Sequence, residues 1–161
     1  MSSRRLFYLL DRAHRAIFRA ADDRLRAEED IGVSQQAVLL ALSERDGRRL
    51  GDLCDVLRLK APATSALLDR MAAKGLVERR ADPDDGRAIA LHLTDRGRDI
   101  LKRTNGLVRA MNDRLLDLLS PGEQAVVLKF LDRLATDGAD LIRQGGDSLP
   151  SYMIAQKREI L

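Results

Sequence analysis

Three arginines and a group of aspartates surround one predicted turn near the middle of the chain. Arg79 and Arg80 precede the turn from Asp82 to Gly86, and Arg87 follows it. The flanking residues alternate between apolar and polar types, which predicts two short strands of a hairpin. Guanidinium groups on such a loop can contact phosphates or a narrow minor groove of DNA, while carboxylates can accept hydrogen bonds that fix the loop.

Two short helices are predicted immediately before this hairpin. Leu50, Leu53 and Leu57 form one face of the first, and the second begins near Pro62 and ends at Gly75. A tight turn joins them. Such a pair commonly presents its second helix to the DNA major groove and a neighbouring loop to the backbone. The alternative is that the alanine-rich second helix only packs against the core.

The outward face of the second helix supplies candidate contacts to bases and phosphates. The inward face is predicted to be Thr64, Leu67 or Leu68, and Met71. The outward candidates are Lys60, Ala63, Ser65, Ala66 and Arg70. Ser65 can donate a hydrogen bond, the two alanines can contact a thymine methyl group, and the two cations can neutralise phosphates. Direct base recognition by this helix is therefore expected to depend on small side chains.

Long helices are predicted at both ends of the chain. Apolar residues recur at helical spacing over residues 4–28, and Ser34 is the predicted N-cap of the next helix. Thr94 is the predicted cap of a long helix, and Ser120 with Glu123 predicts the start of a last helix that includes Ile142. These long helices flank the helix pair and the hairpin described above. The predicted fold class is mainly α with a small β wing (α+β): a winged helix-turn-helix with flanking dimerisation helices.

We predict four parts along the chain. They are an N-terminal dimerisation helix (1–32), a winged helix-turn-helix DNA-binding domain (33–104), C-terminal dimerisation helices (105–147) intertwined with the first helix, and a tail (148–161). A central unit of this size cannot bury long apolar helices from both ends, so a second copy of the chain is expected to cover them. A self-sufficient monomeric bundle is the alternative.

Composition narrows the classes of function. The net charge is +3 and the sequence pI about 9.3, and residues 48–103 hold 13 Lys and Arg against 9 Asp and Glu. A basic segment suits a polyanionic partner. Cys54 is the single cysteine and histidine is scarce, so we expect no internal disulfide, no zinc site, no other metal or cofactor, and a reducing cytoplasm. No membrane span and no catalytic set of residues is predicted.

The motifs around the hairpin resemble those of one known family. They are Leu67-Leu68-Asp69-Arg70-Met71, Lys74-Gly75-Leu76-Val77-Glu78-Arg79, Asp82-Pro83-Asp84-Asp85-Gly86-Arg87 and Leu91-His92-Leu93-Thr94-Asp95-Arg96-Gly97. Together they resemble the winged helix-turn-helix of the multiple-antibiotic-resistance regulator (MarR) family over about residues 34–104. That resemblance implies a homodimeric bacterial transcription factor, usually a repressor, that binds a pseudopalindromic operator and is released by a small ligand such as an aromatic or phenolic compound.

The resemblance also implies roles for individual residues. Arg87 would enter the minor groove, Asp85 would organise the wing, and Asp69 would pair with a wing arginine. Arg79 and Arg80 would contact phosphates. A ligand pocket between the dimerisation helices and the winged domain would be lined by Tyr8, His14, Arg15 and Phe18. A winged-helix module that binds protein without reading DNA remains the alternative function. Independently of the resemblance, we expect His92 to be a solvated strand residue.

Overall fold

The computed structural model of the protein describes residues 5–82, 85 and 88–143. Its elements follow the order α1 (Leu6–Glu29), α2 (Val33–Glu44), β1 (Arg48–Arg49), α3 (Leu50–Leu57), α4 (Ala61–Ala73), β2 (Val77–Ala81), β3 (Ile89–Leu93), α5 (Asp95–Leu116), α6 (Pro121–Thr136) and α7 (Gly138–Arg143). The predicted fold class is confirmed, because these elements are mostly helical and the sheet is small and antiparallel. Among the described residues, no helix is both long and apolar enough to cross a membrane.

The sheet has three antiparallel strands in the order β1-β3-β2. Val77 pairs with Leu93 and Ala81 with Ile89, so β2 and β3 form the predicted hairpin. Arg48 pairs with Leu91 on the other side of β3, which adds the short strand β1. Periodicity could not predict β1, because two residues are too few to show alternation.

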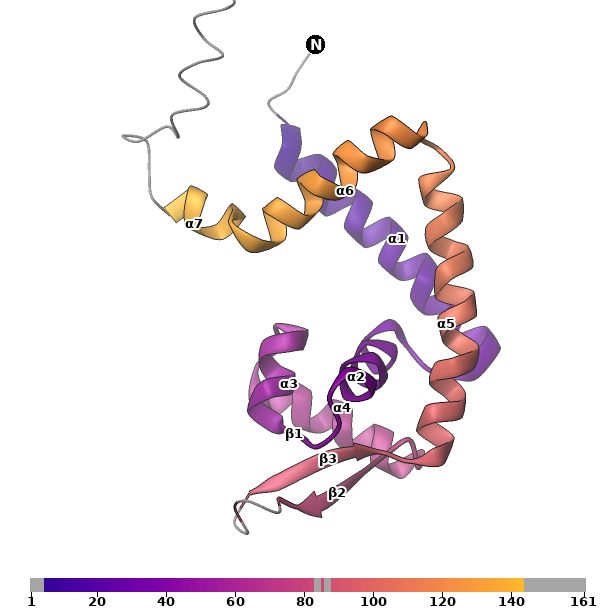
Figure 1. The fold of residues 1–161 in the computed structure, drawn as a ribbon, viewed down its shortest axis with the longest axis vertical. Helices are drawn as coiled ribbons and strands as arrows, with labels where there is room; N and C mark the ends of the chain where they lie inside the picture. The colour runs from indigo at the N-terminus through magenta and orange to yellow at the C-terminus, as the bar shows by residue number, and fades with distance from the viewer. Residues whose placement is uncertain (1–4, 83–84, 86–87, 144–161) are drawn as a thin grey trace, which may run out of the picture. The chain divides into compact units, whose positions relative to one another are not determined.

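The helices α2, α3 and α4 pack around one face of this sheet (Figure 1). Their apolar faces form one core, to which the start of α5 adds two residues. The core residues are Ile31, Val38, Leu39, Ala41, Leu42, Leu53, Leu67, Leu68, Met71, Leu76, Val77, Leu91, Leu93, Ile100 and Leu101. The predicted inward face of α4 is confirmed, since Thr64, Leu67, Leu68 and Met71 are all buried. The opposite face of α4 does not take part in this core.

Thr94 and Gly97 fix the start of α5 against the segment that follows α4. The Thr94 hydroxyl accepts a hydrogen bond from Gly97 N–H at 3.0 Å and donates one to the Gly75 carbonyl at 2.6 Å. The predicted cap at Thr94 is therefore confirmed. A Cβ atom on Gly97 would collide with the Leu76 carbonyl oxygen, so this close approach requires glycine.

The predicted N-cap at Ser34 is wrong. The helix α2 begins at Val33, and the carboxylate of Asp22 on α1 accepts a hydrogen bond from Val33 N–H at 2.8 Å. The N-cap residue is Gly32, whose N–H donates to Gln35 Oε1 at 3.0 Å, so Ser34 lies inside the first turn. The contact from Asp22 comes from another helix, so no local sequence pattern could predict it.

The carboxyl end of α1 is tied to both α4 and α5. Lys74 Nζ at the end of α4 donates to Asp30 Oδ2 at 2.9 Å, and Arg103 Nε on α5 donates to Glu29 Oε1 at 2.7 Å. Asp30 itself has the left-handed backbone conformation, with φ of 53°. These contacts join the junction between α1 and α2 to the helix that precedes the wing.

The chain divides into two compact units, Met1–Asp113 and Arg114–Leu161. In the second unit the predicted last helix is split, because α6 ends at Thr136 and α7 begins at Gly138. The Thr136 hydroxyl donates to the Asp132 carbonyl at 3.2 Å, and glycine at the next helix start adds backbone freedom. The predicted tail at 148–161 lies outside the described residues.

Candidate nucleic-acid interface

The outward face of α4 carries the five residues predicted to meet DNA. Lys60 is the N-cap residue of the helix, with an extended backbone, and Pro62 occupies its first turn. Proline is accommodated there because the first helical N–H groups have no partner within the helix. Lys60, Ala63, Ala66 and Arg70 are exposed, and Ser65 is half-buried. All five therefore lie away from the buried face of the helix.

This outward face is chemically simple over its first two turns. Ala63 and Ala66 present only methyl groups, and Ser65 adds one hydroxyl. The cationic Arg70 follows one turn later. A surface of this kind can contact a thymine methyl group but offers few hydrogen bonds to guanine. Its contribution to base recognition is therefore expected to be mainly apolar.

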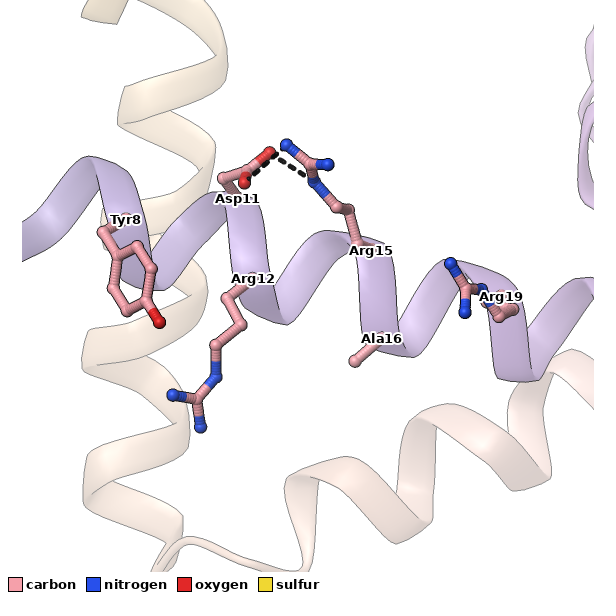
Figure 2. Close-up of a pocket in the computed structure, with 6 residues that line it drawn as sticks. All are labelled: Tyr8, Asp11, Arg12, Arg15, Ala16 and Arg19. Atoms are coloured by element: carbon pink, nitrogen blue, oxygen red, sulfur yellow. Dashed lines mark hydrogen bonds and ion pairs between the residues drawn. The ribbon is translucent and has the colours of Figure 1, made fainter.

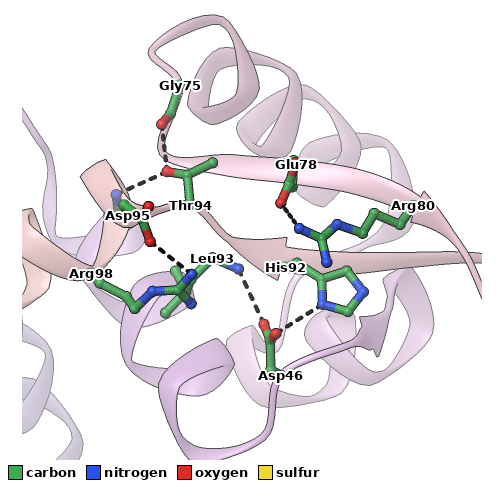
Figure 3. A network of polar contacts seen from close by, with 10 residues as sticks. Asp46, Gly75, Glu78, Arg80, His92, Leu93, Thr94, Asp95 and Arg98 are labelled. Carbon is green, nitrogen blue, oxygen red and sulfur yellow. Dashed lines mark hydrogen bonds and ion pairs between the residues drawn. The ribbon is translucent and has the colours of Figure 1, made fainter.

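The first wing strand is joined to α4 by an ion pair. Arg79 Nη2 lies 2.7 Å from Asp69 Oδ1, as expected for the pairing of Asp69 with a wing arginine. Arg79 shares the core-facing side of the sheet with Val77 and its partner Leu91, so it faces α4. Arg80 points to the other side of the sheet and is paired with Glu78 (Figure 3).

The ends of the wing turn are held by hydrogen bonds around Asp82. Asp82 N–H donates to the Ala88 carbonyl at 3.0 Å, and Ala88 N–H donates to the Asp85 carbonyl at 2.8 Å. Asp82 Oδ1 also accepts from Asp85 N–H at 3.3 Å. Asp85 therefore contributes to the turn through its backbone. Pro83, Asp84, Gly86 and Arg87 lie outside the described residues, so the role predicted for Arg87 remains a prediction.

Sequence reasoning missed Arg49 of β1. Arg49 Nε donates to Asp82 Oδ2 at 2.7 Å, and Arg49 Nη1 lies 3.9 Å from Asp85 Oδ2. The hydrogen bond to Asp82 raises the pKa of the Arg49 guanidinium above its usual value. The only available signal was the pair of arginines before α3, because the strand that carries them is too short to predict.

The prediction that His92 is a solvated strand residue is wrong. His92 Nδ1 lies 2.8 Å from Asp46 Oδ2, and Leu93 N–H donates to Asp46 Oδ1 at 3.1 Å (Figure 3). The His92 side chain is only 19% exposed. Burial raises the pKa of Asp46, but the hydrogen bonds from His92 and Leu93 together outweigh burial and lower it below the usual value. This contact joins the turn after α2 to the second wing strand.

The residues predicted for a ligand pocket are split between two places on α1. Tyr8 and Arg15 line a hollow of about 440 Å³, together with Asp11, Arg12, Ala16 and Arg19 (Figure 2). His14 and Phe18 instead contact each other, with ring centroids 4.8 Å apart. Among the described residues, no group of His, Cys, Asp or Glu could hold a metal ion.

Comparison with known proteins gives consistent matches. A family model described as "MarR family" matches residues 29–88. The HTH-type transcriptional repressor Rv2887 of Mycobacterium tuberculosis is 30% identical over 99 residues, which are 62% of this chain and 71% of the relative. The chain spans about two thirds of the length of the curated relatives that it matches.

Two solved structures resemble the chain along most of their length. The transcriptional repressor CouR, bound to a 23-mer DNA duplex, is 31% identical with a TM-score of 0.75, and covers 84% of this chain and 98% of its own. The PcaV regulator from Streptomyces coelicolor, in complex with its natural ligand, is 28% identical with a TM-score of 0.67, covering 81% of this chain and 89% of its own.

Proposed function

The chain belongs to the MarR family of transcriptional regulators, and we propose that it acts as a homodimeric repressor bound to a pseudopalindromic operator in double-stranded DNA. The observation that carries this proposal is the ion pair between Asp69 of α4 and Arg79 of β2, because it makes the helix and the wing one surface. The repressors Rv2887 and CouR support the repressor role. A regulator of this kind acts in the cytoplasm, where it binds chromosomal DNA.

The recognition helix α4 enters the major groove in this proposal. Lys60 and Arg70 neutralise phosphates, and Ser65 donates a hydrogen bond to a phosphate or base edge. Ala63 and Ala66 contact thymine methyl groups. These roles follow from the positions of the side chains away from the buried face of the helix, four of them exposed and Ser65 half-buried.

The wing supplies the remaining contacts. Arg79 and Arg80 contact phosphates beside the groove, and Arg87 enters the minor groove, where negative potential attracts a guanidinium group. Asp69 and Asp85 organise the wing. Because α4 offers mostly small side chains, the wing carries an unusually large part of the affinity.

A second copy of the chain is proposed to cover the exposed apolar residues of the terminal helices. Among the described residues, these are Leu6, Phe7, Tyr8, Leu9, Ile17 and Phe18 of α1, Val126, Val127, Leu128, Phe130 and Leu131 of α6, and Leu141 and Ile142 of α7. Exposed apolar surface of this extent is typical of an interface. Dimerisation would set two copies of α4 about 34 Å apart, one DNA turn, so that they read two half-sites.

A small ligand is proposed to release the operator. The hollow on α1 combines the ring of Tyr8 with the guanidinium groups of Arg12 and Arg19, while Arg15 is ion-paired with Asp11 (Figure 2). This chemistry favours an aromatic or phenolic compound that carries a carboxylate. A ligand that favours another spacing of the recognition helices needs only a few kcal/mol of differential affinity to empty the operator.

The test measures DNA binding by fluorescence anisotropy. The probes are the duplex upstream of the protein's own gene and duplexes selected by the protein from a randomised library. Arg70→Ala and Arg87→Ala are each expected to weaken binding about tenfold and to reduce the dependence of affinity on salt. Arg143→Ala removes one exposed charge from α7 and serves as the control.

The alternative function makes the opposite prediction. A winged-helix module that binds only protein would select no duplex, and its residual DNA binding would not change with Arg70→Ala or Arg87→Ala. That result would overturn the proposed function.

A further inference from the structure

Arg49 and Asp82 lie on opposite sides of the central strand of the sheet. Arg49 on β1 pairs with Ala90 on β3, and Ala90 pairs on its other side with Arg80, two residues before Asp82. Side chains of paired residues lie on the same face of a sheet, and this face alternates with the core-facing side. Arg49 therefore shares a face with Ala90 and extends across β3.

Ala90 makes this crossing possible. Its side chain is a single methyl group, and the residue is only 1% exposed although it faces away from the helical core. A larger residue on β3 would separate Arg49 from the wing turn. With alanine at this position, Arg49 Nε donates to Asp82 Oδ2 at 2.7 Å.

Asp82 is the residue through which the ends of the wing turn are connected. Its carboxylate accepts from Asp85 N–H, its own N–H donates to the Ala88 carbonyl, and it is 8% exposed. A carboxylate so little exposed requires a cationic partner, because an unpaired buried charge is strongly unfavourable. The two residues thereby connect β1 to the turn across the full width of the sheet.

We propose that Arg49 is a positioning residue for the wing: by binding Asp82, it holds the ends of the wing turn in place for the contact of the wing with DNA. This inference rests on the proposed function. Arg49 acts through Asp82, so its loss and the loss of the Asp82 carboxylate disturb the same turn. A phosphate contact by Arg49, whose side chain is 48% exposed, would instead act independently of Asp82.

A double-mutant cycle on DNA affinity separates these roles. The variants are Arg49→Met, Asp82→Asn and the double variant, measured with a duplex that the unmodified protein selects from a randomised library. Each single change is expected to weaken binding about fivefold or more. The double variant is expected to bind no more weakly than the single variant that has the larger loss of affinity. The salt dependence of affinity is expected to stay the same, and Arg49→Lys is expected to restore part of the binding.

Arg45→Met is the matched control, because Arg45, Arg49 and Asp82 line one hollow of about 510 Å³. It is expected to leave the affinity within about twofold of the unmodified protein. Thermal unfolding of each variant without DNA checks that the fold is retained, and Arg49→Lys provides the milder variant if Arg49→Met unfolds.

Two results would overturn the inference. If Arg49→Met alone weakens binding and lowers the salt slope by about one, Arg49 contacts a phosphate. If neither single change alters affinity, Arg49 does not position the wing. A folded, unmodified protein that selects no duplex would instead overturn the proposed function itself, so the two failures are distinguishable.

Discussion

Asp69 Oδ1 on α4 lies 2.7 Å from Arg79 Nη2 on β2, so one ion pair joins the proposed recognition helix to the first strand of the hairpin. The two side chains are 58% and 39% exposed, respectively. An ion pair this exposed contributes about 0–1 kcal/mol to stability. Its main consequence is geometric, because it sets the position of Arg79 relative to the face of α4.

Arg79→Ala is therefore expected to weaken DNA binding about tenfold while changing the free energy of unfolding by less than about 1 kcal/mol. The loss has two causes, since the variant removes a phosphate contact and the link to α4. Anisotropy titrations at several salt concentrations, with urea unfolding of the free protein, measure both quantities. If the free energies of unfolding and of DNA binding fell by equal amounts, the ion pair would act through stability and not by positioning Arg79.

Asp69→Asn provides a second test of the same pair. It removes a carboxylate from the surface proposed to face DNA, so non-specific binding is expected to strengthen while the preference for the selected duplex falls. The ratio of the two affinities is the quantity to measure. An unchanged ratio would show that Arg79 is positioned without Asp69.

Thymine methyl groups are expected to contribute to recognition by Ala63 and Ala66. Replacing a contacted thymine by deoxyuracil removes one methyl group and is expected to weaken binding about fourfold, equivalent to about 0.8 kcal/mol. Competition binding with singly substituted duplexes measures the effect, and thymines outside the two half-sites provide the control. Uniform affinity across all substituted duplexes would contradict apolar recognition by α4.

Dimerisation is expected to depend on the exposed apolar residues of α6 and α7. Leu131 is 45% exposed and Ile142 is 63% exposed, so a carboxylate at either position introduces little strain in a monomer. Leu131→Asp and Ile142→Asp are expected to shift the protein toward monomer, because a charge would be buried at the interface.

Size-exclusion chromatography with light scattering measures that shift. Lys129→Asp places the same charge at an exposed polar position of α6 and is the control. Affinity for a two-site duplex is expected to fall with the dimer fraction. Unmodified protein that is monomeric at micromolar concentration would favour the self-sufficient bundle.

The Asp46 contact to His92 predicts a pH-dependent contribution to stability. The pKa of Asp46 is lower in the folded protein than its usual value, so the contribution is present above about pH 4 and is lost as the pH falls through the folded pKa. Asp46 is half exposed, so after allowance for solvent screening Asp46→Asn is expected to cost about 0.5 kcal/mol near neutral pH.

Urea unfolding at pH 7 and at pH 3 measures this contribution. The difference between the unmodified protein and Asp46→Asn is expected to shrink at the lower pH. Asp113→Asn removes one exposed carboxylate from α5 and controls for net charge. A difference that grows as the pH falls would have the wrong sign.

The sequence alone determined the order and type of the main elements. Apolar spacing predicted a first helix over residues 4–28, and the structure places α1 at Leu6–Glu29. The alternation around the turn predicted β2 and β3, and Thr94 marked the start of α5. These signals are local, because helix and strand periods and helix caps are written within a few neighbouring residues.

The tertiary structure alone decided which distant groups meet. Asp22 caps α2 from 11 residues away, Arg49 reaches Asp82 across 33 residues, and Asp46 contacts His92 across 46. Each contact satisfies a polar group that the fold partly buries, and its partner is whichever side chain packing brings within hydrogen-bond distance. No spacing rule encodes such pairs, so the connection between the wing and the rest of the sheet emerged only from the folded chain.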